Sequence, residues 1–243
     1  MNQRLPKAIL LDLDDTILND SGGVEHCWSA ACSTCTSELA EVDSAALLEA
    51  IGRTQRWFWS DRERHREGRL DLGAARRRIV GRALAEVGAD PALAERIAES
   101  YGNQRDAAIQ PFPEAIETVR WLRECGSRLA LLTNGSAAAQ RSKISRFELA
   151  DLFDSILIEG EVGYGKPDPR IYAQALRNLG VAPAQAWMVG DNLEWDVAQP
   201  QQLGVFAIWI DIHGAGLPAG HAVRPDRIVS RLAELRSSAP DRH

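Results

Sequence analysis

Five short apolar runs, separated by helix-forming segments, constrain the fold of this chain more than any other feature of its sequence. The first run, residues 8–11, is apolar at every position and stops at a carboxylate, as in a strand that a parallel sheet buries on both faces. Four similar runs follow, at residues 129–132, 155–158, 186–189 and 205–210. Between them lie helix-forming stretches at residues 113–125, 137–147, 169–179 and 193–203. This alternation predicts an α/β fold with a doubly wound parallel sheet, whose ligands bind at the carboxyl ends of the strands.

One long segment breaks the alternation and predicts a second domain. Residues 20–109 have helical periodicity and helix-forming composition without a convincing strand, so we expect an inserted helical unit. The chain returns at Gln110-Pro111-Phe112-Pro113, where Pro113 is expected to begin the next helix. Residues 1–19 and 110–236 would then form the core domain, and residues 237–243 a flexible polar tail.

Charge and composition exclude several classes of protein. The formal net charge of −6 argues against general nucleic-acid binding, which usually requires a basic face. We find no run long enough for a membrane span and no secretion signal at the N-terminus, so we expect a cytoplasmic protein.

Four cysteines in 243 residues do not make a disulfide framework. We interpret Cys32 and Cys35 as small side chains on a helix of the insert.

The polar residues that follow the strands should meet at one edge of the sheet. Asp12 and Asp14 follow the first strand two positions apart, so in extended chain their carboxylates lie on the same side. Two ionised carboxylates this close would repel each other and any phosphate, so a cation is needed, and Mg²⁺ fits such ligands. The later strand ends and loops add further candidates, namely Thr133, Asn134, Gly135, Lys166, Asp191 and Asp196.

Four ordered motifs in the chain resemble those of the haloacid dehalogenase superfamily. They are Asp12-Leu13-Asp14-Asp15-Thr16, Leu132-Thr133-Asn134-Gly135, Gly165-Lys166-Pro167-Asp168-Pro169, and Gly190-Asp191 with Asp196. The chain also resembles the branch in which a helical cap is inserted directly after the first motif. Within that branch it is most similar to phosphatases that act on small metabolites, so a helical cap over residues 20–109 and Mg²⁺-dependent hydrolysis of a phosphate monoester are implied.

The resemblance also implies a role for each motif residue. Asp12 would be the nucleophile that forms an aspartyl phosphate, and Asp14 the general acid and base. Thr133, with Asn134 and Gly135, would bind the phosphoryl group, and Lys166 would neutralise its charge. Mg²⁺ would be held by the Asp12 carboxylate, the Asp14 backbone carbonyl and Asp191, while Asp196 would orient the ligands around the metal.

The insert is rich in arginine and tryptophan, which raises the question of substrate binding. The ordinary interpretation is a solvated charged face paired with Glu63, Glu67 and Asp71, with Trp57 or Trp59 in a helical core. The sharper hypothesis is that Arg53, Arg56 and Trp57, with Trp59, supply side chains that bind the leaving group of a small phosphorylated metabolite.

Other functions remain open at this stage. Gly160 to Lys166 satisfies the pattern of a P-loop nucleotide-binding protein, although Pro167 lacks the hydroxyl and the N–H that a P-loop needs. A phosphate-accepting signalling domain uses a similar set of residues, but its acceptor aspartate follows the third strand. Within the superfamily, a haloacid dehalogenase would need no acid at Asp14, and a phosphosugar mutase would differ mainly in protecting the aspartyl phosphate from water.

Overall fold

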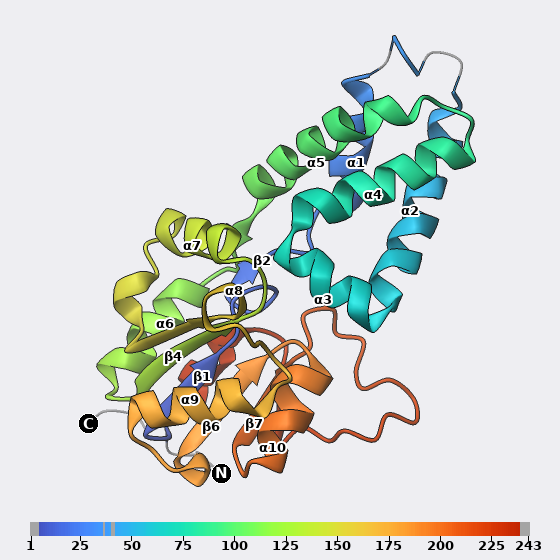
Figure 1. The fold of residues 1–243 in the computed structure, drawn as a ribbon. Helices are drawn as coiled ribbons and strands as arrows, with labels where there is room; N and C mark the ends of the chain where they lie inside the picture. The colour runs from blue at the N-terminus through green and yellow to red at the C-terminus, as the bar shows by residue number, and fades with distance from the viewer. Residues whose placement is uncertain (1–4, 36, 40–41, 239–243) are drawn as a thin grey trace. The chain divides into compact units, whose positions relative to one another are not determined.

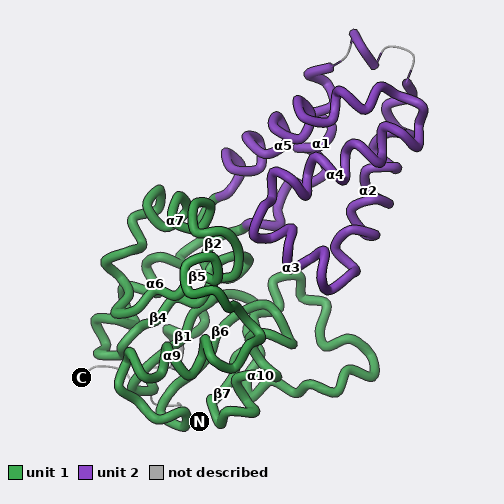
Figure 2. Tube along the Cα trace, in the orientation of Figure 1, with its two compact units in different colours: residues 1–19, 110–243 green, residues 20–109 purple. Residues whose placement is uncertain are grey.

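The computed structural model describes residues 5–35, 37–39 and 42–238, which divide into two compact units (Figure 2). One unit combines residues 1–19 with residues 110–243, and the other is formed by residues 20–109. No helix among the described residues is both long and apolar enough to cross a membrane.

The first unit is built on a parallel sheet of six strands in the order β5-β4-β1-β6-β7-β8 (Figure 1). In chain order these strands are β1 (Ala8–Leu11), β4 (Arg128–Thr133), β5 (Ser155–Ile158), β6 (Ala186–Gly190), β7 (Phe206–Ile210) and β8 (Arg227–Val229). The helices of this unit are α6 (Ala115–Glu124), α7 (Ala137–Arg146), α8 (Glu159–Val162), α9 (Pro169–Leu179) and α10 (Gln199–Gln202). The predicted α/β class with a parallel sheet is confirmed.

The strands of this sheet are apolar throughout because both of their faces are covered. Leu10 and Leu132 face one side, where they share a core with Ile171 and Leu176 of α9. Ile9, the chain neighbour of Leu10, points to the opposite face and is equally buried. Residues buried on both faces explain the unbroken apolar runs in the sequence.

The strand order places β1 at the topological switch point of the sheet. The chain passes from β1 to β4 and β5 on one side and then crosses to β6, β7 and β8 on the other. β1 therefore pairs with both β4 and β6. In such sheets a crevice opens beyond the carboxyl ends of the strands at this point, and the residues that follow β1, β4 and β6 lie there.

Several predicted boundaries are wrong for identifiable reasons. Pro113 does not begin a helix, because it lies in a turn and Glu114, with φ of 60°, precedes the first helical residue, Ala115. The single helix predicted over residues 193–203 is a π-helical stretch, Leu193–Ala198, followed by α10, in which Pro200 lacks an N–H.

Three short strands give too weak a sequence pattern to be predicted. β2 (Leu18–Asn19) and β3 (Gln110–Pro111) pair antiparallel at the two ends of the insert, and β8 closes the edge of the main sheet. They contain two or three residues each, fewer than a periodicity needs to become visible. Residues 237 and 238 of the predicted tail end a 3₁₀-helical segment, Leu232–Ser238, and residues 239–243 lie outside the described part of the chain.

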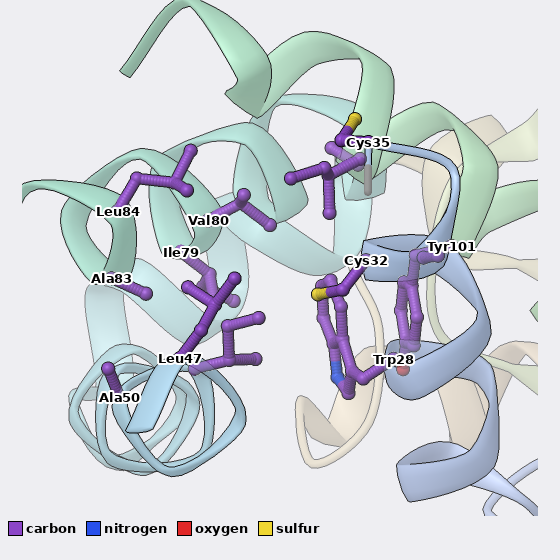
Figure 3. Packing of buried hydrophobic residues seen from close by; sticks show 14 of the residues in the cluster. Trp28, Cys32, Cys35, Leu47, Ala50, Ile79, Val80, Ala83, Leu84 and Tyr101 are labelled. Carbon is purple, nitrogen blue, oxygen red and sulfur yellow. The ribbon is translucent and has the colours of Figure 1, made fainter. Parts of the chain in front are cut away.

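The second unit is helical. Its helices are α1 (Val24–Ser33), α2 (Ser44–Ser60), α3 (Arg62–Leu70), α4 (Leu72–Glu86) and α5 (Ala94–Ala108). α4 packs against α2 and α5, and α1 packs against α5. Figure 3 shows the core between them, in which the Trp28 and Tyr101 rings stack with centroids 3.5 Å apart. Cys32 and Cys35 are free, buried thiols of this core.

Aspartate side chains define the starts of three of these helices. Asp43 accepts a hydrogen bond from Ala45 N, Asp61 from Arg64 N and Asp71 from Ala74 N. Each carboxylate therefore satisfies a backbone N–H that has no partner inside its helix. Asp71, which the sequence suggested as an ion-pair partner for the arginines, acts here as a helix cap.

At two helical glycines of this unit we expect an added methyl group to change the free energy of unfolding in opposite directions. At Gly68 a Cβ would lie 2.5 Å from Phe58 Cε1, so Gly68→Ala should lower the free energy of unfolding by about 1–3 kcal/mol. At Gly81 the nearest atom would be Ala94 Cβ at 3.6 Å, so Gly81→Ala should raise it by up to about 1 kcal/mol through helix propensity. Denaturant unfolding followed by tryptophan fluorescence measures both. Stabilisation by Gly68→Ala would contradict the tight α2–α3 packing.

Candidate active site

The ends of β1 and β6, together with the loop after β5, bring three predicted residues into contact. Asp12 N donates to Val189 O at 3.0 Å, which extends the β1–β6 ladder by one residue and places the Asp12 carboxylate at the strand end. Lys166 Nζ lies 2.8 Å from Asp12 Oδ1 and 2.6 Å from Asp196 Oδ1. These residues are separated by up to 184 positions in the sequence, and the parallel sheet makes them neighbours.

The Lys166 ammonium is buried between these two carboxylates. Its side chain is 1% exposed, and Asp196 is fully buried. Burial alone would lower the pKa of Lys166, but the charges of Asp12 and Asp196 outweigh that effect and raise the pKa well above its usual range. Lys166 is therefore a permanent positive charge at this strand edge.

The backbone of Lys166 is held as firmly as its side chain. Asn134 Nδ2 donates to Lys166 O, and Lys166 N donates to Asn134 Oδ1, both at 2.7 Å. A Cβ on Gly165 would lie 2.5 Å from Asn134 Oδ1, so glycine is required for this close approach. Because both groups of the Asn134 amide bind Lys166, Asn134 positions the lysine.

Gly135 follows Asn134 in the predicted phosphoryl-binding group of Thr133, Asn134 and Gly135. Its N–H donates to Glu159 Oε2 at 3.1 Å. Glu159 begins α8, so this bond ties the loop after β4 to the end of β5. Glu159 was not among the sequence candidates, since a glutamate after the third strand carries no motif signal.

Three carboxylates gather around Lys166 and form a possible metal site. One carboxylate oxygen from each of Asp12, Asp191 and Asp196 can be chosen so that the three lie within 4.8 Å of one another. Burial, with the neighbouring carboxylates, raises the pKa of Asp12 well above its usual range and that of Asp191 to about 7. Lys166 supplies one positive charge against three negative charges, so the site suits a divalent cation bound by carboxylate oxygens.

Asp196 differs from the other two carboxylates because both of its oxygens are engaged. Oδ1 accepts from Lys166 Nζ, and Oδ2 accepts from Asn192 N at 3.1 Å. A Cβ on Gly190 would lie 2.4 Å from Asp196 Cγ, so the glycine makes room for this carboxylate. Lys166 and Asn192 therefore fix the orientation of the Asp196 carboxylate. Asp191 is held separately, through its carbonyl, by Trp209 Nε1 at 2.6 Å.

Asp14 is held by a second set of residues that the sequence analysis missed. Gln140 Nε2 donates to Asp14 Oδ2 at 2.8 Å, and Lys143 Nζ lies 2.7 Å from Asp14 Oδ1. Gln140 Nε2 also donates to Thr133 Oγ1. The available signal was the spacing of Gln140 and Lys143, which places them on one face of the helix that Ser136 caps directly after the Thr133 motif.

The predicted cap residues lie in the helical unit, where neighbours within that unit hold them. Arg53 donates to Glu86 Oε1 through both Nε and Nη2, at 3.0 and 2.6 Å, and Arg53 Nη1 lies 3.5 Å from Glu49 Oε2. The Trp57 ring lies 4.2 Å from the Arg64 guanidinium and 4.3 Å from that of Arg82. Arg56 is exposed on α2.

Comparisons with known proteins agree on one family. The family model of haloacid dehalogenase-like hydrolases matches residues 6–204. A phosphoserine phosphatase from Thermus thermophilus is 36% identical over 249 residues, covering 94% of this chain and 97% of that protein. A glyceraldehyde 3-phosphate phosphatase from Methanopyrus kandleri is 30% identical over 208 residues, covering 84% of this chain and 83% of that protein.

A solved structure extends the likeness to the fold. A 2-haloacid dehalogenase from Pseudomonas syringae pv. tomato superposes with a TM-score of 0.62 at 30% identity, covering 96% of this chain and 98% of that one.

The raised pKa of Asp191 predicts that Asp191→Asn stabilises the metal-free protein above neutral pH. A folded pKa of about 7, against an ordinary value of 3.8, means that ionised Asp191 destabilises the folded state above pH 7. This effect is small at pH 4 and disappears below about pH 3, where the carboxyl is protonated in both states. At pH 8 the free energy of unfolding of the variant should exceed that of the wild type by up to about 4 kcal/mol.

Denaturant unfolding in excess chelator at pH 8 and pH 4 measures this difference. Asp151→Asn, which changes an exposed carboxylate, is the matched control and should match the wild type at both values. Equal free energies of unfolding for Asp191→Asn and the wild type at pH 8 would show that ionised Asp191 does not destabilise the folded state.

Proposed function

Because the chain belongs to the haloacid dehalogenase-like hydrolase family and has phosphatases among its relatives, we propose that it is a Mg²⁺-dependent phosphatase of small phosphorylated metabolites. Its substrate would be a phosphate monoester, and Asp12 would form an aspartyl phosphate. The acidic net charge of −6 supports a small-molecule substrate over a nucleic acid.

The observation that carries this proposal is that Asp12 and Asp14 have different neighbours, which suit one to nucleophilic attack and the other to proton transfer. Asp12 Oδ1 accepts from Leu13 N at 2.7 Å and contacts Lys166, which leaves Oδ2 as the oxygen with lone pairs to spare. Asp14 stands outside the carboxylate cluster and is held by Gln140 and Lys143. A nucleophile beside a fixed cation and a separate carboxyl for proton transfer are what phosphate-ester hydrolysis requires.

In the first step an Asp12 carboxylate oxygen attacks phosphorus and the ester P–O bond breaks. Asp14 gives its proton to the leaving oxygen, so the product departs as an alcohol. Lys166 balances the negative charge on Asp12 and on the phosphoryl group, and the Thr133 hydroxyl donates to a phosphoryl oxygen.

In the second step water attacks phosphorus and the bond between Asp12 and phosphorus breaks. Asp14, now ionised, takes the proton from water, which restores the starting state and releases inorganic phosphate. Splitting the reaction in this way replaces one difficult displacement with two easier ones.

The donor set fits Mg²⁺, which prefers one or two carboxylates together with waters and phosphate oxygens. The Asp12 carboxylate, the Asp14 backbone carbonyl and Asp191 would hold it, and Asp196 would orient that set through Lys166 and Asn192. When bound, the metal would supply the positive charge that the three carboxylates and the phosphoryl group require.

A haloacid dehalogenase is the second candidate, because a solved dehalogenase has 30% identity to the chain. Displacement of a halide needs no proton on the leaving group, so a dehalogenase would have no use for an acid at Asp14. Here two side chains hold the Asp14 carboxylate, which favours phosphate chemistry. Chloride release from 2-chloropropionate would support the second candidate.

The rivals of other classes fit the structure poorly. A P-loop lysine belongs to the first turn of a helix, whereas Lys166 lies three residues before α9 and its ammonium pairs with Asp12 and Asp196. A signalling domain would carry its acceptor after β5, where this chain has Glu159 bound to Gly135 N. A phosphosugar mutase would share the first step and would differ from a phosphatase in releasing no inorganic phosphate.

The mechanism predicts that Asp12→Asn and Asp14→Asn each lower kcat for phosphate esters by at least about 100-fold. Asp12→Asn removes the nucleophile, and Asp14→Asn removes the group that exchanges the proton. Release of phosphate from p-nitrophenyl phosphate and from a panel of phosphorylated metabolites, with Mg²⁺ and with excess chelator, measures the effect. The panel also separates hydrolysis from mutase activity, because only hydrolysis releases inorganic phosphate.

Asp168→Asn is the matched control for these two variants, since Asp168 caps α9 and has no proposed part in the chemistry. Its kcat should stay within about twofold of the wild type. Full activity of Asp12→Asn, or of the wild type in chelator, would overturn the proposed mechanism.

The cap hypothesis predicts a different pattern of kinetics. If Arg53, Arg56 or Trp57 binds the leaving group, alanine at that position should raise KM or change the order of preferred substrates by about 10-fold or more. Activity on p-nitrophenyl phosphate, which lacks the natural leaving group, should change less. Arg77→Ala, which removes an exposed α4 arginine paired with Glu95, serves as the control. Unchanged kinetics across the panel would exclude these residues from substrate binding.

A further inference from the structure

Gln140 and Lys143 together occupy both oxygens of the Asp14 carboxylate. Gln140 Nε2 lies 2.8 Å from Oδ2 and Lys143 Nζ 2.7 Å from Oδ1. Gln140 is buried, and the Lys143 side chain is 14% exposed, so neither contact is an ordinary surface pair. Held at both oxygens, the carboxylate has little freedom to rotate.

The amide of Gln140 has its orientation determined by these partners. An ionised carboxylate only accepts hydrogen bonds, so the group that faces Asp14 must be the amide NH₂. That NH₂ has two hydrogens, and its two acceptors are Asp14 Oδ2 and Thr133 Oγ1. One side chain therefore links the residue proposed to move the proton with the residue proposed to bind the phosphoryl group.

This link also decides what the Thr133 hydroxyl can do. Because Thr133 Oγ1 accepts from Gln140, its own hydrogen is not used in that bond. Its remaining contact, to Asn134 O at 3.5 Å, is at the limit of a hydrogen bond. The hydroxyl hydrogen is thus available to a phosphoryl oxygen.

We propose that Gln140 and Lys143 are positioning residues, which orient Asp14 for proton transfer and direct the Thr133 hydroxyl toward the phosphoryl group. The inference rests on the proposed function, in which Asp14 exchanges a proton with the leaving group and with water. When Asp14 carries its proton, Gln140 still holds one oxygen and the flexible Lys143 side chain can release the other. Neither residue belongs to the sequence motifs of the nucleophile, the phosphate-binding threonine, the lysine or the metal ligands.

The two residues should differ in their effect on good and poor leaving groups. p-Nitrophenolate leaves readily as an anion, whereas an alkoxide depends on the proton from Asp14. Lys143 pairs with Asp14, so its loss should matter chiefly for alkyl esters. Gln140 also holds Thr133, so its loss should slow both kinds of ester.

The test compares Lys143→Met and Gln140→Leu with the wild type in Mg²⁺, on p-nitrophenyl phosphate and on phosphoserine or the alkyl phosphate that the wild type hydrolyses fastest. Lys143→Met should lower the single-turnover rate of alcohol release from the alkyl ester by about 10- to 100-fold, and that of p-nitrophenol release by about threefold or less, because this first step isolates the need for the Asp14 proton. KM should change by less than about threefold, and Lys143→Arg should recover most of the alkyl-ester activity. Gln140→Leu should lower kcat for both esters.

Arg141→Met is the matched control, because Arg141 lies on the same helix and pairs with Glu161 away from Asp14. Its kinetics should match those of the wild type, and thermal unfolding should show all variants folded. An equal loss on both esters in Lys143→Met, a rise in KM alone, or no loss at all would overturn the inference while the wild type stays active. A wild type that hydrolyses no phosphate ester would overturn the proposed function, and the inference with it.

Discussion

The rest of the site depends on the ammonium of Lys166, buried between the carboxylates of Asp12 and Asp196. Removing a charge of this kind leaves its partners buried and uncompensated, which is strongly destabilising. Two glycines leave room for this contact: a Cβ on Gly190 would clash with Asp196, and a Cβ on Gly165 would clash with Asn134. Asn134 in turn holds the Lys166 backbone by two hydrogen bonds. The charge centre and its scaffold thus form one packed unit at the carboxyl edge of the sheet.

The charges around Lys166 also explain why the site could bind a cation. Lys166 balances one of three carboxylates, and burial raises the pKa of both Asp12 and Asp191. A divalent ion bound there would remove the remaining repulsion and let a phosphate dianion approach. The chain belongs to the haloacid dehalogenase-like hydrolases and has a phosphatase among its relatives.

Two independent systems hold the two aspartates of the first motif. Asp12 depends on Lys166 from the loop before α9, whereas Asp14 depends on Gln140 and Lys143 of α7. Separating the proposed nucleophile from the proposed proton-transfer group would allow each carboxylate to be oriented and charged by its own neighbours. Gln140 connects the second system to Thr133, the residue proposed to bind the phosphoryl group.

The sequence by itself determined the parallel sheet, the helical insert and the motif residues of the site. Buried strands must be apolar along their whole length, and residues at the carboxyl ends of parallel strands must meet at one edge. Tertiary structure alone decided which side chains hold those residues. Gln140, Lys143, Glu159 and Trp209 look like ordinary helix and strand residues. Their importance comes from hydrogen-bond partners 18 to 129 positions away in the sequence. A hydrogen-bond partner distant in sequence leaves no local pattern, because only folding brings the two groups together.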